Sequence, residues 1–396
     1  MTKDMTEGAI PHLLVGFTIP LVLGNLFQLL YNAVDSMIVG KFVGETALAA
    51  VGTSSPLMTL AILFISGMCM GASVLMSSQY GAKDYDTLSR QISTTMLAGC
   101  GFSVVFSLLM LLLANPVLRL IRVPETAIPE AAAYLRIIFM GLIFTFMYNF
   151  LANTMRALGD SKTPLYFLVT SAFLNIFGDL FFVVVLRWGV AGSAIATVCS
   201  EGLCCLLCGI YIKKKIPLLC LGKKWWVFDK SLLGKTVSYG STSAMQQVCL
   251  QLGKLIIQSV VNTQGVAVMA AFTAVNRVDD FAYTPQQNIG HAMTTFLAQN
   301  KGAGHKERMK KGFQTGLLIE LVYSIGLFCV IWGLAPQIMT LFAEDGDAQV
   351  VSLGISYLHL ISWMYILPGL TNGVQGFFRG IGDLKVTLYS TFMNMF

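Results

Sequence analysis

Apolar runs of about 20 residues recur along the whole of this 396-residue chain. Coiled as a helix, a run of that length spans the hydrocarbon core of a bilayer, which is roughly 30 Å thick. The chain is 55% hydrophobic and 12% charged, whereas soluble domains are about 25% charged. We therefore predict an all-α integral membrane protein with little room for a soluble domain.

The apolar runs predict eleven helices, of which the first begins near Leu13 and continues past Asn25. Because no cleavage site follows a short apolar stretch there, this helix is interpreted as a permanent span and not as a signal peptide. The predicted helices cover residues 13–34, 48–78, 91–114, 132–155, 164–186, 190–212, 233–261, 266–298, 313–334, 351–376 and 384 to the end.

Lys and Arg are unequally divided between alternate loops. One set of loops holds most of them, including the Lys-rich segment 213–235 and the cluster at 301–311, while the opposite set holds few and carries acidic residues at 344–347. Cytoplasmic loops carry the excess of basic residues, so the first set and the amino terminus are predicted to lie in the cytoplasm. The formal charge of +6 is thus a topology signal of a multi-pass protein of the cell membrane, and no nucleic-acid partner is expected.

The nine cysteines fall in predicted helices or, for Cys220, in a basic loop, so disulfides are not expected. Cys205 and Cys208 form a C-x-x-C, but it lies in a span without a second pair or a neighbouring His, and we assign no metal to it. The four histidines are also scattered without ligand spacing, which disfavours a membrane-embedded enzyme. They are His12, His291, His305 and His359.

An internal repeat divides the chain. Arg156-Ala-Leu-Gly-Asp160 recurs as Arg379-Gly-Ile-Gly-Asp383, and Gly81-Ala82 recurs at nearly the same spacing as Gly302-Ala303. An even number of spans separates the copies, which predicts a parallel repeat related by an axis along the membrane normal.

The repeat predicts two six-helix lobes, at residues 1–212 and 236–396, joined by a cytoplasmic basic linker at 213–235. The second copy ends at Phe396 inside its fifth helix. We therefore expect twelve spans, and a longer chain, in the complete protein.

Polar residues inside the predicted spans are aligned on single helix faces. An ionisable side chain at mid-span costs about 3 kcal/mol, so it needs a partner or a wet cavity. The first helix carries a stripe at i, i+3, i+4 and i+7, and three later helices of the first lobe carry pairs at i, i+4. The stripe is Gln28, Tyr31, Asn32 and Asp35, and the pairs are Asn149 and Asn153, Asn175 and Asp179, and Thr197 and Glu201.

Asp35 and Asp179 are the principal candidates for a cation site in the first lobe. Two carboxylates, an amide oxygen and a hydroxyl form either an oxygen-rich cage for Na⁺ or a site where one Asp is protonated because adjacent like charges are disfavoured. Alternatively, Asn175 and Asp179 only bond between helices as structural glue. Pro20 precedes the stripe and removes a backbone hydrogen bond, which predicts a kink in the first helix.

The second lobe carries related but different stripes. Lys254 is too central in its helix to reach the interface easily, so we expect it to pair with a carboxylate such as Asp280. The polar residues expected to face the same central cavity in this lobe are Gln247, Gln251, Lys254, Asp280, Tyr283, Asn372 and Gln375.

These residues resemble the multidrug and toxin compound extrusion (MATE) family over the whole chain. The similarity rests on the Asp35 context from Tyr31 to Gly40, on the turn at residues 79–82, on the two Arg-x-x-Gly-Asp turns, and on Asn175-x3-Asp179 with Thr197 downstream. The resemblance implies a V-shaped pair of six-helix lobes around a central cavity, exchanging H⁺ or Na⁺ for amphipathic, often cationic, drugs by alternating access.

In one branch of this family the cation site uses side chains that match Asp35, Asn175, Asp179 and Thr197. Glu201 stands where an uncharged residue is more usual, and we include it in the predicted site. Another branch uses a Glu of helix seven for Na⁺, but this chain has Gln and Lys254 there, which puts a cation site in that helix in doubt.

The leading hypothesis is a secondary antiporter, because the chain has no G-x-x-x-x-G-K-[ST] loop for ATP. We expect no cofactor besides the coupling ion, small organic cations as substrates, and a monomer in the bilayer. The alternative is a flippase of lipid-linked precursors, which would favour a strongly basic cavity. A channel would show passive flux without exchange.

Overall fold

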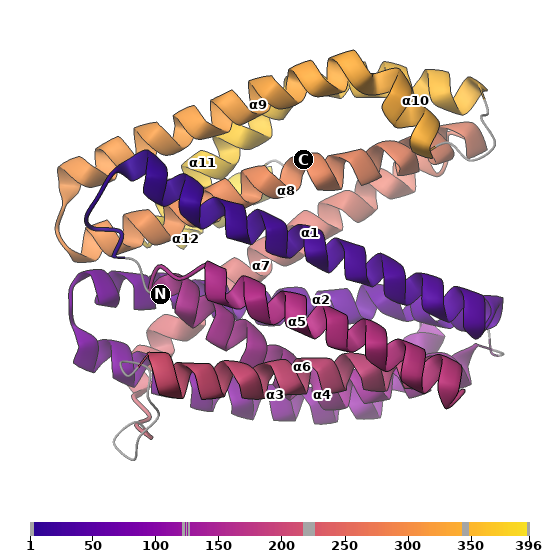
Figure 1. The fold of residues 1–396 in the computed structure, drawn as a ribbon, viewed down its shortest axis with the longest axis horizontal. Helices are drawn as coiled ribbons and strands as arrows, with labels where there is room; N and C mark the ends of the chain where they lie inside the picture. The colour runs from indigo at the N-terminus through magenta and orange to yellow at the C-terminus, as the bar shows by residue number, and fades with distance from the viewer. Residues whose placement is uncertain are drawn as a thin grey trace. The chain divides into compact units, whose positions relative to one another are not determined.

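The protein is an all-helical chain in a computed structural model that describes residues 4–120, 123, 125, 127–216, 226–342 and 348–393, and no strand occurs within those ranges (Figure 1). Its helices are α1 (Ile10–Phe42), α2 (Glu45–Gly81), α3 (Tyr85–Leu120), α4 (Ile128–Ala157), α5 (Lys162–Asp179), α6 (Gly189–Lys215), α7 (Lys230–Val261), α8 (Val266–Gly302), α9 (Lys306–Phe342), α10 (Ala348–Ser362), α11 (Ile366–Gly380) and α12 (Leu384–Met393). A π-helical segment, Leu180–Val185, continues α5, and a 3₁₀ turn, Trp363–Tyr365, joins α10 to α11.

All eleven predicted helices are present, and within the described residues eight helical segments are long and apolar enough to cross a membrane. The predicted helix 351–376 is the joined pair α10 and α11. The 3₁₀ turn between them has a local cause, because Pro368 lacks the N–H that would bond the carbonyl of Met364. Helices α7 and α8 are as long as the others, but they are not among these eight segments because their polar stripes make them less apolar.

The repeat is visible in the backbone. Gly159 and Gly382 of the two Arg-x-x-Gly-Asp turns both have left-handed conformations, with φ of 82° and 84°. Glycine adopts this conformation without the steric cost that other residues meet. Gly44 and Gly265, which immediately precede the second helix of each copy, form another pair with positive φ, at 112° and 99°. The repeated motifs are therefore helix-ending turns with a shared backbone requirement.

The chain forms two compact units, and two helices contribute to both. The first unit contains Leu23–Met245, and the second unit contains Asp4–Val22 and Gln246–Phe396. Helix α1 thus passes from the second unit to the first after Val22, and α7 passes from the first unit to the second after Met245, at the corresponding point of the repeat. The predicted lobes 1–212 and 236–396 differ from these units in the amino-terminal parts of α1 and α7.

The packing of apolar and small residues explains why α1 and α7 each belong to both units. Leu14 and Phe17 of α1 belong to a buried cluster with Met293 and Phe296 of α8. In the first unit, a Cβ on Gly67 of α2 would lie 2.4 Å from the Cα of Ala244 in α7, so glycine lets the two backbones meet.

Helix α1 runs through Pro20 as one uninterrupted α-helix (Figure 1). The predicted kink is thus not seen as a break in the helix. Pro20 lies just before the point where α1 changes units. In the predicted linker 213–235, α6 extends to Lys215 and α7 begins at Lys230, while residues 217–225 lie outside the described residues.

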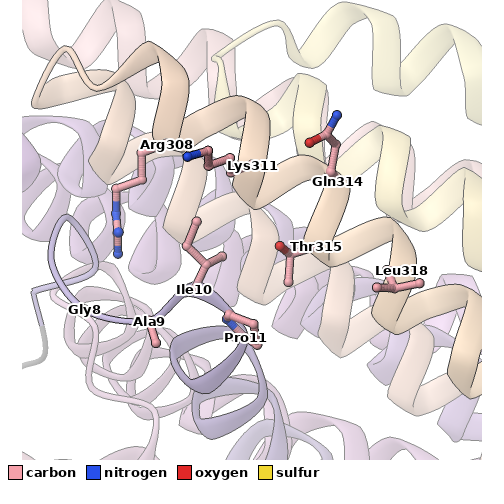
Figure 2. Close-up of a pocket in the computed structure, with 9 residues that line it drawn as sticks. All are labelled: Gly8, Ala9, Ile10, Pro11, Arg308, Lys311, Gln314, Thr315 and Leu318. Carbon is pink, nitrogen blue, oxygen red and sulfur yellow. The ribbon is translucent and has the colours of Figure 1, made fainter.

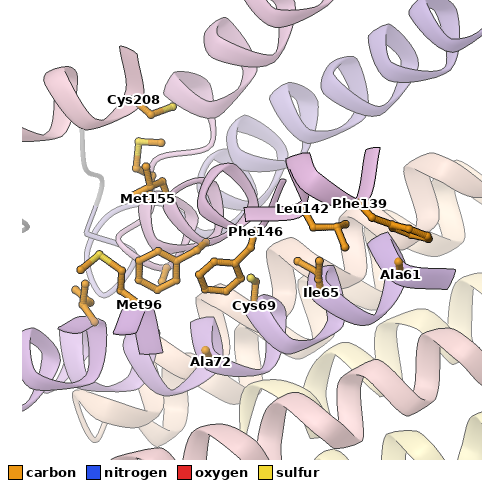
Figure 3. Close-up of a cluster of buried hydrophobic side chains, with 14 of the residues drawn as sticks. Ala61, Ile65, Cys69, Ala72, Met96, Phe139, Leu142, Phe146, Met155 and Cys208 are labelled. Atoms are coloured by element: carbon orange, nitrogen blue, oxygen red, sulfur yellow. The ribbon is translucent and has the colours of Figure 1, made fainter. Parts of the chain in front are cut away.

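A buried apolar cluster holds α2, α3, α4 and α6 together in the first unit (Figure 3). Phe146 of α4 lies within it beside Ile65 and Cys69 of α2. A Cβ on Gly99 of α3 would lie only 1.9 Å from the Phe146 ring, so the ring fills the space that a side chain at position 99 would need. This packing fixes α4, which supports the polar residues described next.

Candidate functional site

Four of the residues predicted for the cation site lie in one polar cluster of the first unit, on α1, α5 and α6. The hydroxyl of Ser193 donates to Oδ1 of Asp35 at 2.8 Å. On the neighbouring helices, Nδ2 of Asn175 donates to Oγ1 of Thr197 at 3.2 Å, and the Thr197 hydroxyl donates to the carbonyl of Ser193 at 3.1 Å. The structure thus assembles Asp35, Asn175, Asp179 and Thr197, while their role in transport stays a prediction.

Asp179 is fully buried within this cluster, with an exposed fraction of 0%. No described residue donates a hydrogen bond to either of its carboxyl oxygens, and Oδ1 of Asn175 also accepts none. The neighbour of Asp179 is the carboxyl group of Asp35. Two carboxyl groups can bond to each other only when one carries a proton. The site is therefore rich in acceptor oxygens and poor in donors, which suits a proton or a hard cation.

Small residues bring α5 and α6 close enough to build the site. A Cβ on Gly178 would lie 2.9 Å from the Cβ of Ala196, and one on Gly192 would lie 3.0 Å from the carbonyl oxygen of Phe182. The π-helical segment begins directly after Asp179, and such segments often occur at functional sites. Close approach of the backbones places the polar faces of the two helices against each other.

Glu201 extends the cluster toward α4. Its Oε2 accepts a hydrogen bond from Oγ1 of Thr145 at 2.5 Å. Glu201, Asp35 and Asp179 all lie within electrostatic reach of the buried Tyr134 hydroxyl. The first unit therefore holds three carboxyl groups, on α1, α5 and α6, that influence the Tyr134 hydroxyl electrostatically.

Sequence reasoning missed Thr145, Ser193 and Tyr134. Ser193 precedes Thr197 by one helical turn, so the α6 stripe in fact runs from Ser193 to Glu201. Thr145 likewise precedes Asn149 by one turn on α4. Extending each polar pair by one helical turn would have found both hydroxyls, whereas Tyr134 lies outside any polar stripe.

The other predicted cavity residues of the first unit take different positions. Tyr31 lies beside Gln28 and within electrostatic reach of Asp35 and Glu201, and Gln28 and Asn32 are exposed. The amides of Asn149 and Asn153 donate to carbonyl oxygens one turn back on α4, at 2.9 and 2.8 Å. Both asparagine nitrogens are therefore used within their own helix.

The expected ion pair of Lys254 is present in the second unit. Its Nζ lies 3.2 Å from Oδ1 of Asp280, and the two side chains are 65% and 47% exposed. Gln247, Gln251, Tyr283 and Asn372 are all partly buried in this unit.

Gln375 differs from the expectation that it faces a cavity. Its Oε1 accepts from Nε2 of Gln246 at 2.9 Å, and its Nε2 donates to Oγ1 of Thr391 at 3.3 Å. Nη2 of Arg379 donates to Oε1 of the same Gln246 at 3.2 Å. Because both ends of the Gln375 amide are occupied in a buried network, this side chain joins α7, α11 and α12.

A pocket of about 550 Å³ lies in the second unit, between the start of α1 and the side of α9 (Figure 2). Arg308 and Lys311 line it beside Ile10 and Leu318. None of the predicted cavity residues borders this pocket. It is therefore a separate feature from the polar cluster of the first unit.

Two repeated helical units with membrane-length apolar helices and a buried carboxyl cluster define a multi-pass membrane protein of the transporter class. The family model MatE matches residues 20–181 and 243–396, and the chain belongs to this family of MATE efflux transporters. It is 32% identical over 388 residues to "Probable multidrug resistance protein YpnP" of Bacillus subtilis (strain 168), a match covering 97% of this chain and 86% of that protein.

Further comparisons agree with the family and with the fold. The chain is 30% identical over 389 residues to "Probable multidrug resistance protein YoeA" of the same bacterium, covering 96% of this chain and 82% of that protein. A solved structure described as the outward-facing conformation of a multidrug resistance MATE family transporter matches with a TM-score of 0.91 and 23% identity, over 98% of this chain and 87% of that one. The fold predicted from the sequence is thereby confirmed.

Proposed function

We propose that this protein is a secondary active exporter that exchanges H⁺ or Na⁺ for amphipathic, cationic organic compounds. The observation that carries the proposal is the buried carboxyl group of Asp179, whose oxygens accept no hydrogen bond from the described residues, beside the partly buried carboxyl group of Asp35. A bare carboxylate in hydrocarbon is costly. A cation bound at this pair removes that cost, so the protein favours different conformations with and without the bound cation.

The coupling follows from competition for the same charge. With a proton or Na⁺ bound, the Asp35 and Asp179 pair is neutralised and attracts a cationic compound weakly. After the cation leaves, the exposed negative charge attracts the organic cation through the polar stripe of α1. Binding of the two is therefore mutually exclusive, and alternating access converts that exclusion into exchange.

An ion gradient supplies enough energy for this exchange. One cation moving down about 100 mV releases about 2.3 kcal/mol, and a tenfold concentration gradient adds about 1.4 kcal/mol. The substrate class is proposed from relatives named as multidrug resistance proteins. The distribution of basic loops supports a cytoplasmic amino terminus in the cell membrane.

Dye efflux from proteoliposomes tests the proposal. The full chain is reconstituted, loaded with ethidium, and given an imposed H⁺ or Na⁺ gradient, for wild type, Asp35→Asn and the control Asp86→Asn, whose carboxylate is exposed on α3. We expect gradient-driven efflux from wild type and control and none from Asp35→Asn. Folded wild-type protein that moves no dye under either gradient would overturn the exporter and favour a lipid-linked precursor flippase.

A further inference from the structure

Glu320 of α9 is a buried carboxyl group that the sequence patterns do not single out. Its exposed fraction is 0%, and neither Oε1 nor Oε2 has a hydrogen-bond partner among the described residues. No described Lys, Arg or His forms an ion pair with it. Helix α9 is apolar enough to cross the membrane, so an unpaired charge there would be expensive.

The polar groups around Glu320 have already used their donors. Nε2 of Gln286 donates to Oγ of Ser324 at 3.0 Å and to the carbonyl of Tyr365 at 2.8 Å. Because a carbonyl only accepts, the Gln286 amide cannot turn over without losing that bond. The Ser324 hydroxyl donates to the carbonyl of Glu320 at 2.8 Å. The groups left without a hydrogen bond here are acceptor oxygens, since Oε1 of Gln286 also accepts no bond from the described residues.

These groups converge on the face of α11 that carries Gly369. A Cβ on Gly369 would lie 2.7 Å from Oγ of Ser324, 3.2 Å from Nε2 of Gln286 and 3.5 Å from Oε2 of Glu320. Glycine therefore makes room for the cluster. Among the titratable groups on the elements packed here, the hydroxyl of Tyr323 donates to the carbonyl of Ala282 at 3.0 Å, and the hydroxyl of Tyr365 donates to Asp279.

In the first unit, the positions that correspond to Glu320 and Gly369 are occupied by uncharged residues. The spacing that relates Gly81 to Gly302 also relates Gly99 of α3 to Glu320 of α9. Likewise, the spacing of the two Arg-x-x-Gly-Asp turns relates Phe146 of α4 to Gly369 of α11. In the first unit the Phe146 ring packs on Gly99. In the second unit the large and small positions are exchanged, and the large one is a carboxylic acid. Apolar packing alone does not account for that choice.

We propose that Glu320 is a second proton-binding site of this transporter, separate from the pair of Asp35 and Asp179. The inference rests on the proposed exporter function. In the arrangement described, the carboxyl group holds a proton, which makes it neutral and provides the donor that the acceptor oxygens lack. Release of the proton requires water to reach the cluster, and Tyr365, whose carbonyl closes it, belongs to the 3₁₀ turn between α10 and α11.

Infrared difference spectroscopy tests the site on the purified full chain. Raising the pH should remove a protonated-carboxyl band in wild type that is absent from Glu320→Gln and present in Asp279→Asn, the matched control. If wild type and Glu320→Gln show the same protonated-carboxyl bands, the proposal is overturned. Loss of the band on adding Na⁺ at constant pH, in wild type and not in Glu320→Gln, would also overturn it and identify Na⁺ as the occupant.

Transport stoichiometry gives an independent readout. In proteoliposomes, Glu320→Gln should still export dye, with the protons moved per substrate reduced by about half because one of two protonation sites is gone. An unchanged stoichiometry means that Glu320 has only a structural role. Wild-type protein without any gradient-driven export would refute the exporter function, whereas the infrared measurement would still decide whether Glu320 binds a proton.

Discussion

The two units share their backbone plan but place their carboxyl groups differently. In the first unit, Asp35 and Asp179 lie on α1 and α5. The residue of α7 that corresponds to Asp35 is Gln258, which donates to Asn262 at 2.7 Å. In the second unit the buried carboxyl group lies instead on α9, at Glu320. The repeat therefore determines the helices and turns of both units, whereas single-residue differences between the copies determine which helices carry the carboxyl groups.

Exchanging the corresponding residues of α1 and α7 should have the largest effect. Asp35→Gln, which copies the second unit into the first, should lower gradient-driven dye efflux on the order of 100-fold, because the coupling carboxylate is lost. Gln258→Asp, the reverse exchange, should leave efflux close to wild type. Equal losses in both variants would show that the two units contribute alike and would remove the distinction.

The packing of Phe146 on Gly99 should be the next most sensitive point. Gly99→Ala places a Cβ 1.9 Å from the ring and should destabilise the folded protein by about 1–3 kcal/mol through overpacking. A second change, Phe146→Leu, should restore part of the melting temperature in detergent. If Gly99→Ala alone melts like wild type, the tight contact in the first unit is not required.

The buried network of the second unit should give a smaller loss. By the spacing that relates Arg156 to Arg379, Gln246 and Gln375 correspond to Leu23 and Ala152 of the first unit. Gln246→Leu removes the acceptor of Arg379 and should cost about 1–3 kcal/mol in unfolding free energy, because a buried donor loses its partner. Thermal melting measures it, and the exposed neighbour change Met245→Leu serves as the control.

The smallest effect is expected at the start of α7. The backbone N–H of Leu232, followed by that of Ser231, and the Arg90 guanidinium lower the pKa of Asp229. A lowered pKa means that the carboxylate stabilises the folded state above the ordinary Asp pKa of about 3.9, and that this contribution fades as the pH falls below it. Asp229→Asn should therefore melt slightly below wild type at neutral pH, and the difference should vanish in acid. A difference independent of pH would contradict this account.

The apolar runs and the recurring motifs were sufficient to predict the helices and the repeat. Long apolar runs have few alternatives to a membrane helix, so all eleven helices were found, and Gly159 and Gly382 marked the repeated turns correctly. The pairing of Lys254 with Asp280 was also predicted, because a central Lys needs a carboxylate. Ser193 was missed because the polar pair of α6 was not extended by one helical turn, and Glu320 was missed although Ser324 follows it by one turn on α9.

The sequence by itself thus determined that the chain is a helical membrane protein with two related halves, and it named the carboxylates of the first unit. Only the tertiary structure decided that α1 and α7 each change units, that Gln375 is locked in a buried network, and that Glu320 lies among acceptors without a donor. The physical reason is that helix formation depends on neighbours along the chain. Hydrogen-bond satisfaction and close backbone approach depend on residues far apart in sequence, such as Gly369 and Glu320, that only packing brings together.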